Sequence, residues 1–354
     1  MNIVDIELKH KKYKIHIEKG ILNTIGEHIE ELYKGKNIVL ITDWNVEKFH
    51  LERVCKSLEK SKFYVKYISI KPGEQSKTLS TLQEVYEKFC DYGLKRGDLI
   101  ISLGGGVVGD LAGFAAATYL RGIKYVQIPT SLLAQVDSSI GGKVAVDLPY
   151  GKNLVGSFYH PEAVFIDSEV LQTLDKKFFN DGMAEIIKYG LIRDRSISDM
   201  VLKYDNKEEI LENIEEIIYK CCSIKKNIVE NDERDMGERM LLNFGHTLGH
   251  CIEKYFNYEI YTHGEAVAIG MVHITKKSEG LGITEKGTYD YIRGVLQKYE
   301  LPFTIPDADY NELFEAINYD KKAEDNAINL VLLTKVGEGK IINISMNDIE
   351  KYIV

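Results

Sequence analysis

The chain has 354 residues, a net charge of -9 at pH 7 and a pI near 5.6. A chain of this length exceeds what one hydrophobic core usually serves, so we expect two domains. The acidic balance argues against nucleic-acid binding through a broadly basic surface. The sequence has no uncharged apolar run long enough to span a bilayer, and its first residues lack the pattern of a signal peptide. We therefore expect neither a nucleic-acid nor a membrane partner.

The five cysteines are scattered and form no C-x-x-C motif. They are Cys55, Cys90, Cys221, Cys222 and Cys251. An odd number at irregular spacing predicts reduced thiols in a cytoplasmic protein rather than a disulfide framework.

The first half of the sequence alternates strand-like and helix-like segments. Residues 2–8 and 13–17 alternate around a short turn and predict a hairpin. Further strands are predicted at 37–42, 63–70, 99–103, 125–128 and 164–166, and a helix at 78–92. Strands separated by helical crossovers predict a parallel sheet.

The second half has mostly helical periodicity. Helices are predicted at 178–192, 208–230, 238–255, 263–280 and 285–299, and only 328–333 and 340–344 have an extended pattern. We therefore expect an α/β domain over residues 1–177 and a mainly helical domain over residues 178–354.

A glycine-rich turn follows the strand at 99–103. Residues 104–109 fit G-x-G-x-x-G, whose backbone amides can hold a pyrophosphate at a helix N-terminus. The alternative is a tight strand-to-helix turn without a ligand. The motif does not lie in the first strand–helix unit, which argues against an ordinary Rossmann domain. Asp43, at the end of an earlier strand, either accepts ribose hydroxyls or caps a helix that begins at Trp44.

Residues 130–152 form a polar, glycine-rich stretch. Lys143 and Lys152 each follow a glycine, which suits a loop that closes on an anion. The alternative is a solvated surface loop, although the apolar Val144 and Val146 argue against full exposure.

Four polar residues in the second half have helical spacing. Arg239, Asn243, His246 and His250 are separated by four, three and four positions and would share one helix face. The residues between them are mostly apolar or glycine, which predicts a buried helix. A buried stripe of this kind is costly unless it holds a metal, an anion or a substrate.

Two further segments carry candidate groups. Glu185 and Lys188 share one helix face, and taken alone they suggest an exposed ion pair. Thr262 and Glu265 have the spacing of a capping box, which places His263 at the first position of a helix. The helix dipole there is expected to keep the imidazole of His263 neutral.

Glu185 and two histidines supply the His₂Glu composition of catalytic zinc sites. His246 is one of the two histidines. The spacing alone does not rank His250 against His263 as the other.

Together these motifs resemble the 3-dehydroquinate synthase family of sugar-phosphate cyclases. The matching stretches are 104–117, 132–143, 151–153, 182–190, 242–250 and 263–268, in family order within residues 37–335. The resemblance implies a Rossmann-like N-terminal domain of the dehydroquinate synthase and glycerol dehydrogenase type, followed by a mainly helical domain. It also implies conversion of 3-deoxy-D-arabino-heptulosonate 7-phosphate, a sugar-phosphate acid, to 3-dehydroquinate and phosphate in the shikimate pathway.

The resemblance also implies the cofactors and the site residues. It places zinc, or cobalt, on Glu185, His246 and His263, which ranks His263 above His250. It implies NAD contacts from Asp43, Asn45, Glu74, Lys77, Gly105, Gly106, Val107, Val108, Gly109, Asp110, Thr130, Ser131, Lys143 and Lys152. It assigns substrate contacts to Asp137, Lys143, Lys152, Asn153, Lys188, Lys225, Arg239, Asn243, His250 and one of Lys321 and Lys322, of which we favour Lys322. It implies a homodimer in which Arg121 reaches the phosphate in the partner subunit's site.

Three positions depart from the family pattern. Val144 and Ser131 stand where threonine is common, and Asp147 stands where asparagine is common. We expect these residues to change local hydrogen bonds in the loops and not the reaction.

Three other functions fit the sequence less well. A 2-deoxy-scyllo-inosose synthase acts on a substrate without a carboxylate, and Arg239 with Lys152 and Lys225 argues for an acid substrate instead. A metal- and NAD-dependent polyol dehydrogenase needs no cluster of cations. A non-catalytic NAD-binding or scaffold protein would not need the polar stripe.

Overall fold

The computed structural model describes residues 1–305, 308, 313 and 327–353. It divides into two compact units, Met1–Asp175 with Leu211–Glu230, and Lys176–Ile210 with Asn231–Val354. Most of the long helix α8 (Lys207–Asn231) therefore groups with the first unit. The expected division has a single boundary near residue 178, whereas in the structure the segment Leu211–Glu230 groups again with the first unit.

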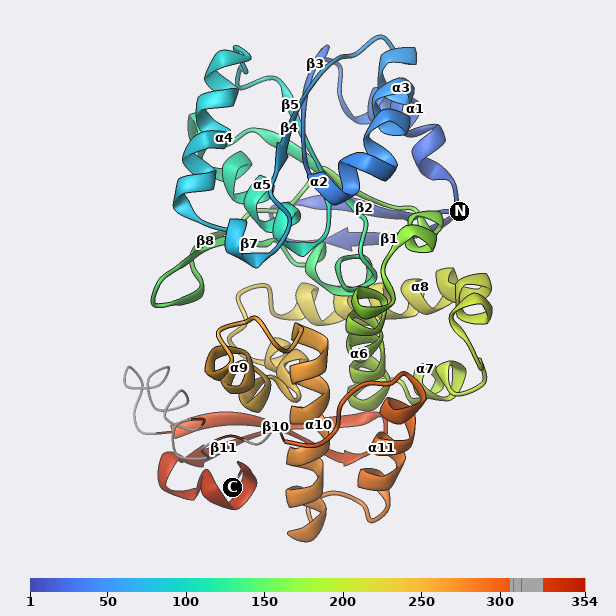
Figure 1. Cartoon of the computed structure of the whole chain (residues 1–354), viewed down its shortest axis with the longest axis vertical. Helices are drawn as coiled ribbons and strands as arrows, with labels where there is room; N and C mark the ends of the chain where they lie inside the picture. The colour runs from blue at the N-terminus through green and yellow to red at the C-terminus, as the bar shows by residue number, and fades with distance from the viewer. Residues whose placement is uncertain (306–307, 309–312, 314–326, 354) are drawn as a thin grey trace. The chain divides into compact units, whose positions relative to one another are not determined.

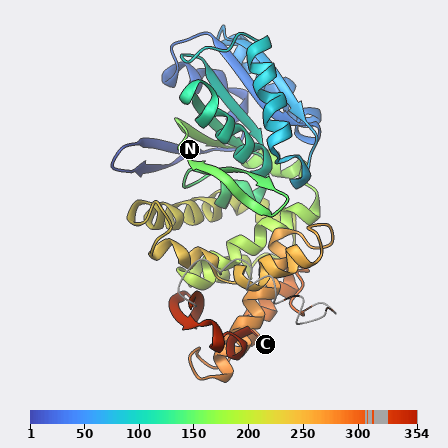
Figure 2. The same cartoon turned by 90° about the vertical axis from the view of Figure 1, so that its left-hand side faces the viewer.

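The first unit contains a seven-stranded sheet. Its order is β1 (Asn2–Glu7), β2 (Lys12–Ile17), β9 (Ala163–Ile166), β6 (Lys124–Pro129), β5 (Leu99–Gly104), β3 (Asn37–Asp43) and β4 (Tyr64–Ile70). β1 and β2 are antiparallel, and every other neighbouring pair is parallel. The predicted hairpin and parallel sheet are confirmed, and Figure 2 shows the hairpin in dark blue at the edge of this unit.

Helices cover both faces of the sheet, because successive strand residues point to opposite sides. Ile38 and Leu40 pack with α1 (Ile25–Leu32) and α3 (Glu52–Lys60) in one core cluster. Val39 and Ile41 pack with α4 (Leu79–Asp91) and α5 (Gly106–Thr118) in the other. Figure 1 shows these two helix pairs on opposite sides of the strands. A sheet buried on both faces explains the nearly continuous apolar runs of the strands.

The strand order reverses between β3 and β5. The chain passes from β3 to β4 on one side, and then crosses so that β5 pairs with the other edge of β3. In open α/β sheets, ligands bind outside the carboxyl ends of strands at such a switch point. Asp43 ends β3 and Gly104 ends β5, so the two candidate nucleotide-binding segments follow the strands on either side of it.

We expected residues 130–152 to form a loop, but the structure shows regular elements there. They contain the short helix η5 (Ala134–Ser138), the strand β7 (Lys143–Leu148) and the start of β8 (Gly151–Phe158), which pairs antiparallel with β7. Val144 and Val146 are buried in the core cluster beside α5. The sequence did not indicate strand β7, because its apolar face consists of only a few side chains among many glycine and polar residues. The remaining short helices of the unit are η1 (Ile21–Asn23), α2 (Trp44–Val46), η2 (Glu47–Leu51), η3 (Glu74–Ser76), η4 (Tyr119–Arg121) and η6 (Ser168–Thr173).

The second unit is mainly helical, as predicted. Its elements are α6 (Lys176–Ile192), α7 (Arg195–Val201), η7 (Glu238–Asn243), α9 (His246–Tyr255), α10 (His263–Gly280), α11 (Thr288–Lys298), the hairpin β10 (Ala327–Lys335) and β11 (Glu338–Ser345), η8 (Met346–Asp348) and α13 (Glu350–Ile353). Most of α10 is buried, including eleven of its residues from Gly264 to Ser278. It packs against α6, α9 and α11 and is therefore the central helix of the unit.

The single helix predicted over 238–255 is wrong. The 3₁₀ helix η7 ends at Asn243, and α9 begins at His246 after Gly245, which has a φ of +80°. A Cβ on Gly245 would lie 2.6 Å from Met271 Cγ and 2.7 Å from the carbonyl oxygen of Val267. The close approach of α10 therefore requires glycine at this break.

The expected continuous buried stripe is also wrong. Arg239 is buried on η7, whereas Asn243 and His250 are exposed. His246 and His250 lie on α9, whereas Arg239 and Asn243 lie on η7.

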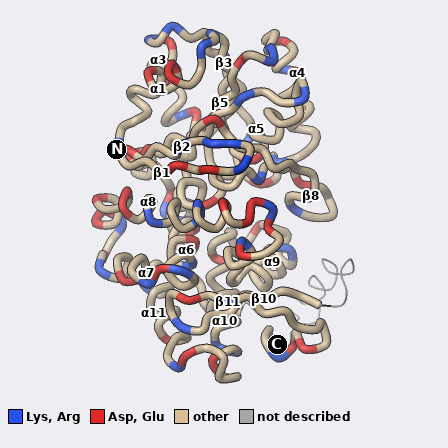
Figure 3. The backbone as a smooth tube through the Cα atoms, turned by 180° about the vertical axis from the view of Figure 1, so that it is seen from behind, with Lys and Arg blue, Asp and Glu red and all other residues tan. Residues whose placement is uncertain are grey.

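None of the helices in the described ranges is long and apolar enough to cross a membrane. Figure 3 shows acidic and basic residues interleaved along the backbone of each unit.

Candidate functional site

Glu185 and Lys188 form a buried ion pair on α6. Each side chain is only 1% exposed, and Lys188 Nζ donates a hydrogen bond to Glu185 Oε2. An exposed pair of this spacing would contribute a few tenths of a kcal/mol, whereas a buried carboxylate requires partners for both oxygens. The other oxygen, Glu185 Oε1, is buried and has no hydrogen-bond partner. The surface-pair interpretation is therefore wrong, and one carboxylate oxygen is left for another ligand.

Two imidazoles face this oxygen. His246 Nε2 lies 3.9 Å and His263 Nε2 lies 3.8 Å from Glu185 Oε1. The three residues come from α9, α10 and α6, and their ligand atoms all lie within 4.8 Å of one another. The structure thus brings together the three residues for which a metal was expected.

The outer nitrogen of each ring faces an acceptor. His246 Nδ1 lies 3.1 Å from the carbonyl oxygen of Phe244, and His263 Nδ1 lies 3.5 Å from Glu253 Oε2. An acceptor at Nδ1 favours the tautomer with its proton there and leaves the Nε2 lone pair free. Both rings can therefore present Nε2 to a cation beside Glu185.

His250 belongs to a second, overlapping group. His250, Glu253 and His263 also have ligand atoms within 4.8 Å of one another, and the ring centroids of His250 and His263 are 6.2 Å apart. Sequence reasoning did not single out Glu253, which is 3% exposed. The sequence feature that could have indicated Glu253 is its helical spacing, seven residues after His246 and three after His250.

The two histidines have pKa values shifted in opposite directions. Burial lowers the pKa of His246 well below its usual value, and Lys188 lowers it further. Burial also acts to lower the pKa of His263, but Glu253 and Glu185 outweigh it and raise that pKa to about 9. These carboxylates therefore oppose the expected effect of the helix dipole on His263, because full charges on nearby carboxylates exceed the partial charge of a helix terminus.

The start of α10 is held by two carboxylates. The predicted capping box is present, since Thr262 Oγ1 accepts from Glu265 N at 3.3 Å and Glu265 Oε2 accepts from Thr262 N at 2.8 Å. Asp181, one turn before Glu185 on α6, accepts the backbone N–H of Gly264. A Cβ on Gly264 would overlap the carbonyl oxygen of Asp181. Glycine therefore allows the close contact between α6 and α10 that places His263 beside Glu185.

Arg239 is 3% exposed, and its surroundings are polar. Its Nη1 donates to the carbonyl oxygen of Glu233 at 2.6 Å, and its backbone N–H donates to Asp232 Oδ2 at 3.0 Å. Burial would raise the pKa of Asp232, but hydrogen bonds from three backbone N–H groups lower it. The ionised Asp232 therefore fixes the turn that carries Arg239.

In the first unit, the glycine-rich turn lies beside the segment after β6. Thr130 N donates to the carbonyl oxygen of Gly104 at 3.0 Å, and a Cβ on Gly105 would lie 3.3 Å from Ser131 Oγ. The first turn of α5 begins at Gly106 and also includes Val107, Val108 and Gly109. The two segments expected to contact NAD, the glycine-rich turn after β5 and Thr130–Ser131 after β6, are therefore adjacent.

Asp43 acts as a helix cap. Its Oδ1 accepts from Asn45 N at 2.9 Å and from Val46 N at 3.1 Å. The capping alternative is thus confirmed. It uses one oxygen and places the carboxylate at the carboxyl end of β3, so capping does not compete with a ligand role for Oδ2.

Lys77 is buried at the centre of a polar cluster. Its Nζ lies 2.6 Å from Asn153 Oδ1, 3.1 Å from Asp110 Oδ2 and 3.3 Å from Glu74 Oε1. Burial would lower its pKa, but these carboxylates raise it above its usual value. Burial raises the pKa of Asp110 to about 6, against the opposing effect of Lys77. Three residues expected at the NAD or substrate site therefore contact Lys77, which is expected there as well.

The same cluster includes one departure from the family pattern. Asp147 Oδ1 lies 3.7 Å from Lys77 Nζ and accepts from Asn153 N at 2.8 Å. Lys152 Nζ lies 3.8 Å from Glu74 Oε1. The carboxylate at position 147 therefore ties the β7–β8 hairpin to Lys77.

Asp137 and Lys225 form another pair within the first unit. Lys225 Nζ lies 2.8 Å from Asp137 Oδ1 and donates to the backbone carbonyl of the same residue at 2.7 Å. Lys225 lies in the part of α8 that groups with this unit, although the expected boundary placed it in the other domain.

Two other expected residues lie on the surface of the first unit. Lys143 and Arg121 are exposed, and Arg121 has a φ of +67° in η4. Lys321 and Lys322 lie outside the described residues.

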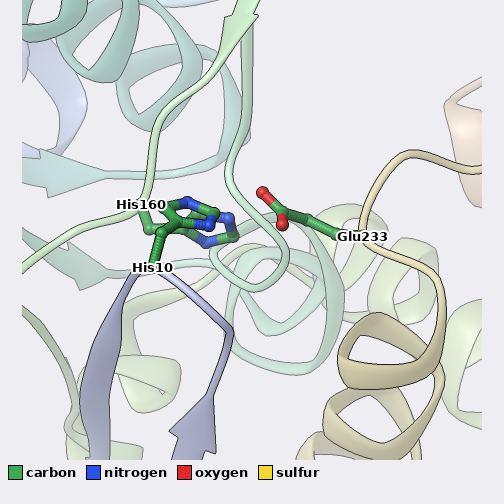
Figure 4. Close-up of side chains that lie close together, drawn as sticks. All are labelled: His10, His160 and Glu233. Atoms are coloured by element: carbon green, nitrogen blue, oxygen red, sulfur yellow. The ribbon is translucent and has the colours of Figure 1, made fainter.

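Figure 4 shows two histidines of the first unit, His10 and His160, that the sequence reasoning did not single out. The ring centroids of His10 and His160 are 5.9 Å apart. A Cβ on Gly142 would lie 2.7 Å from the His160 ring, so the imidazole packs directly on the backbone that leads into β7.

Comparisons with known proteins agree along the whole chain. Residues 67–181 match the family described as 3-dehydroquinate synthase N-terminal, and residues 182–323 match 3-dehydroquinate synthase C-terminal. A 3-dehydroquinate synthase from Clostridium kluyveri is 59% identical over 353 residues, which cover 100% of this chain and 98% of that protein.

Two solved structures share the fold. A 2-deoxy-scyllo-inosose synthase, complexed with carbaglucose-6-phosphate, NAD⁺ and Co²⁺, has a TM-score of 0.87 at 26% identity over 99% of both chains. A 2-epi-5-epi-valiolone synthase from Streptomyces hygroscopicus, with NAD⁺ and Zn²⁺ bound, has a TM-score of 0.88 at 23% identity, covering 97% of this chain and 96% of that one. Since both family matches and a full-length relative carry the same description, the chain belongs to the 3-dehydroquinate synthase family.

Proposed function

We propose that the chain converts 3-deoxy-D-arabino-heptulosonate 7-phosphate to 3-dehydroquinate and phosphate. The observation that carries the proposal is the buried Oε1 of Glu185, which has no hydrogen-bond partner and is faced by Nε2 of His246 and of His263. The chain also belongs to the 3-dehydroquinate synthase family. Identity of 59% to a 3-dehydroquinate synthase, against 26% to the inosose synthase, favours the acid substrate over the alternative cyclase.

The second unit has the donors for a divalent metal. Glu185, His246 and His263 would hold it, because one carboxylate oxygen and two imidazoles form a catalytic zinc set with open positions. A cation there would also supply the partner that Glu185 Oε1 lacks. Co²⁺ and Zn²⁺ in the two related structures support either metal.

The first unit has the features of an NAD site. The amides at the start of α5 would hold the pyrophosphate, and Asp43 Oδ2 would accept a ribose hydroxyl. Glu74, Lys77 and Asp110 would line the same site, together with Thr130 and Ser131. The NAD⁺ in both related structures supports this assignment.

When bound, NAD⁺ supplies a hydride acceptor that is regenerated within the turnover, and the metal supplies a Lewis acid for the substrate hydroxyls. The chain itself supplies cations for the substrate's carboxylate and phosphate. We assign this role to Lys143, Lys152, Lys188, Lys225, Arg239 and Lys322, with Asp137, Asn153, Asn243 and His250 as polar contacts. Lys188 is buried beside Glu185, so it is already removed from water. Stabilising an oxyanion would therefore require little further desolvation of this cation.

We further propose that the chain works as a homodimer and that Arg121 contacts the substrate phosphate in the partner subunit's site. Its exposure supports this role, because the guanidinium lies on the surface of its own unit.

The reaction itself is tested by incubating the protein with the heptulosonate phosphate, catalytic NAD⁺ and Zn²⁺. Phosphate and dehydroquinate should form in equal amounts without net NADH, because the hydride returns to the substrate. The absorbance of NADH is followed alongside both products, with Glu185→Ala as the inactive control. A stoichiometric rise in NADH would support the polyol dehydrogenase instead.

The metal ligands are tested by chelation and by two histidine variants. A chelator should abolish activity and Zn²⁺ should restore it. His263→Ala should lose bound metal, whereas His250→Ala should keep it, because His263 belongs to the group of ligand atoms around Glu185 and His250 does not. Zinc content after dialysis is the measurement. The reverse pattern would show that the ligand assignment is wrong.

The recognition of the carboxylate is tested with Arg239→Lys. Lysine lacks the planar fork that binds a carboxylate through two hydrogen bonds, so substrate binding should weaken by about 2–5 kcal/mol. Binding of NAD⁺ and zinc should not change. Calorimetry with the substrate and with an analogue lacking the carboxylate measures the preference, and Arg195→Lys, on an exposed side chain of α7, is the matched control. If the variant keeps the full preference for the acid, Arg239 does not recognise the carboxylate.

The shared site is tested by mixing two inactive variants, Arg121→Ala and Glu185→Ala. Hybrid dimers should contain one site in which both residues are intact, so part of the activity should return after subunit exchange. Exchange is monitored independently with differently labelled subunits. Failure to recover activity despite proven exchange would exclude a role for Arg121 across the interface.

A further inference from the structure

The carboxylate of Glu253 is an unusual feature of the site because it is buried on the far side of one imidazole. It is 3% exposed on α9, and its Oε2 lies 3.5 Å from His263 Nδ1. The opposite ring nitrogen, His263 Nε2, lies 3.8 Å from Glu185 Oε1. The ring of His263 therefore lies between two buried carboxylates that face its two different nitrogens.

We propose that Glu253 is a positioning residue that accepts a hydrogen bond from Nδ1–H of His263 and directs Nε2 toward the metal held with Glu185 and His246. This inference rests on the proposed function, since it concerns the same metal site. An ionised acceptor at Nδ1 fixes the tautomer, orients the ring and makes Nε2 a stronger ligand.

The other histidine has the corresponding arrangement with a neutral acceptor. His246 Nδ1 faces the carbonyl oxygen of Phe244 at 3.1 Å, while its Nε2 faces Glu185. Glu253 thus performs for His263 what a backbone carbonyl performs for His246. Because Glu253 and His246 lie two turns apart on α9, one helix carries both a ligand and the residue that orients a second ligand.

The competing possibility is that Glu253 is itself a ligand. His250, Glu253 and His263 also have close ligand atoms, but a metal there would lie at Nδ1 of His263. Two features favour the Glu185 side. Glu185 Oε1 is buried without a hydrogen-bond partner, and His246 already directs Nε2 toward it, whereas His250 is exposed.

The primary test compares metal affinity in Glu253→Gln and wild type. Zn²⁺ affinity is measured by competition with a chromophoric chelator, and the absorption spectrum of bound Co²⁺ reports the ligand set. Glu253→Gln should bind one metal about 10–100-fold more weakly while keeping the wild-type Co²⁺ spectrum, as expected when an outer partner of a ligand is weakened. Glu259→Gln, an exposed glutamate beyond the same helix, is the matched control and should leave both readouts unchanged.

Two outcomes would overturn the inference. An affinity equal to wild type would show that Glu253 does not support His263. Weaker binding together with a changed spectrum of bound Co²⁺, as in Glu185→Gln, would show that Glu253 is a ligand.

A second measurement does not depend on how the variant folds. Nitrogen NMR of the zinc-bound wild-type protein assigns the tautomer of His263. The proton should be on Nδ1 and the metal on Nε2, and the opposite assignment would overturn the inference.

Turnover of the heptulosonate phosphate by wild type separates this inference from the proposed function. If wild type converts the substrate but the Glu253 readouts fail, only the role of Glu253 is wrong. If zinc binding depends on Glu253 but no turnover occurs, the metal site stands and the proposed reaction is wrong.

Discussion

The second unit is organised around the charge of Glu185, because an ionised carboxylate removed from water must be compensated within the protein. Lys188 compensates one oxygen from the next turn of α6, and two imidazoles from other helices face the second oxygen. Three helices must therefore meet at one point. The break at Gly245 and the contact of Asp181 with the start of α10 are the structural consequences, since both depend on close helix approach.

The first unit meets the same requirement with the opposite charge at its centre. Lys77 is a buried cation, and Asp110 of α5, Glu74 of η3 and Asn153 of β8 surround it. Asp147 strengthens this arrangement where the family commonly has asparagine, because its carboxylate both faces Lys77 and accepts a backbone N–H from Asn153. The hairpin β7–β8 is therefore held to the rest of the unit in two ways. Asp147 and Asn153 contact Lys77, and Val144 and Val146 are buried in the core cluster that includes α5.

These two charge clusters differ in what they leave unsatisfied. Lys77 has several oxygen acceptors within reach, so its ammonium group is satisfied within the unit. Glu185 retains an oxygen without a hydrogen-bond partner. In a native protein, a buried polar atom left without a partner requires an explanation, and a metal ion is the one that the neighbouring donors support.

Local patterns in the sequence were enough to predict the parallel sheet, the mainly helical second half and the capping box at Thr262, because strand alternation, helical periodicity and cap residues act over a few positions. The His₂Glu composition was also visible, but the choice between His250 and His263 came only with the family resemblance. Three features depended on contacts between segments distant in the chain. Gly245 breaks the expected helix because α10 passes too close for a side chain, and the return of α8 places Lys225 beside Asp137. Glu253 was missed because a glutamate at helical spacing resembles any surface acid until a histidine from another helix is packed against it.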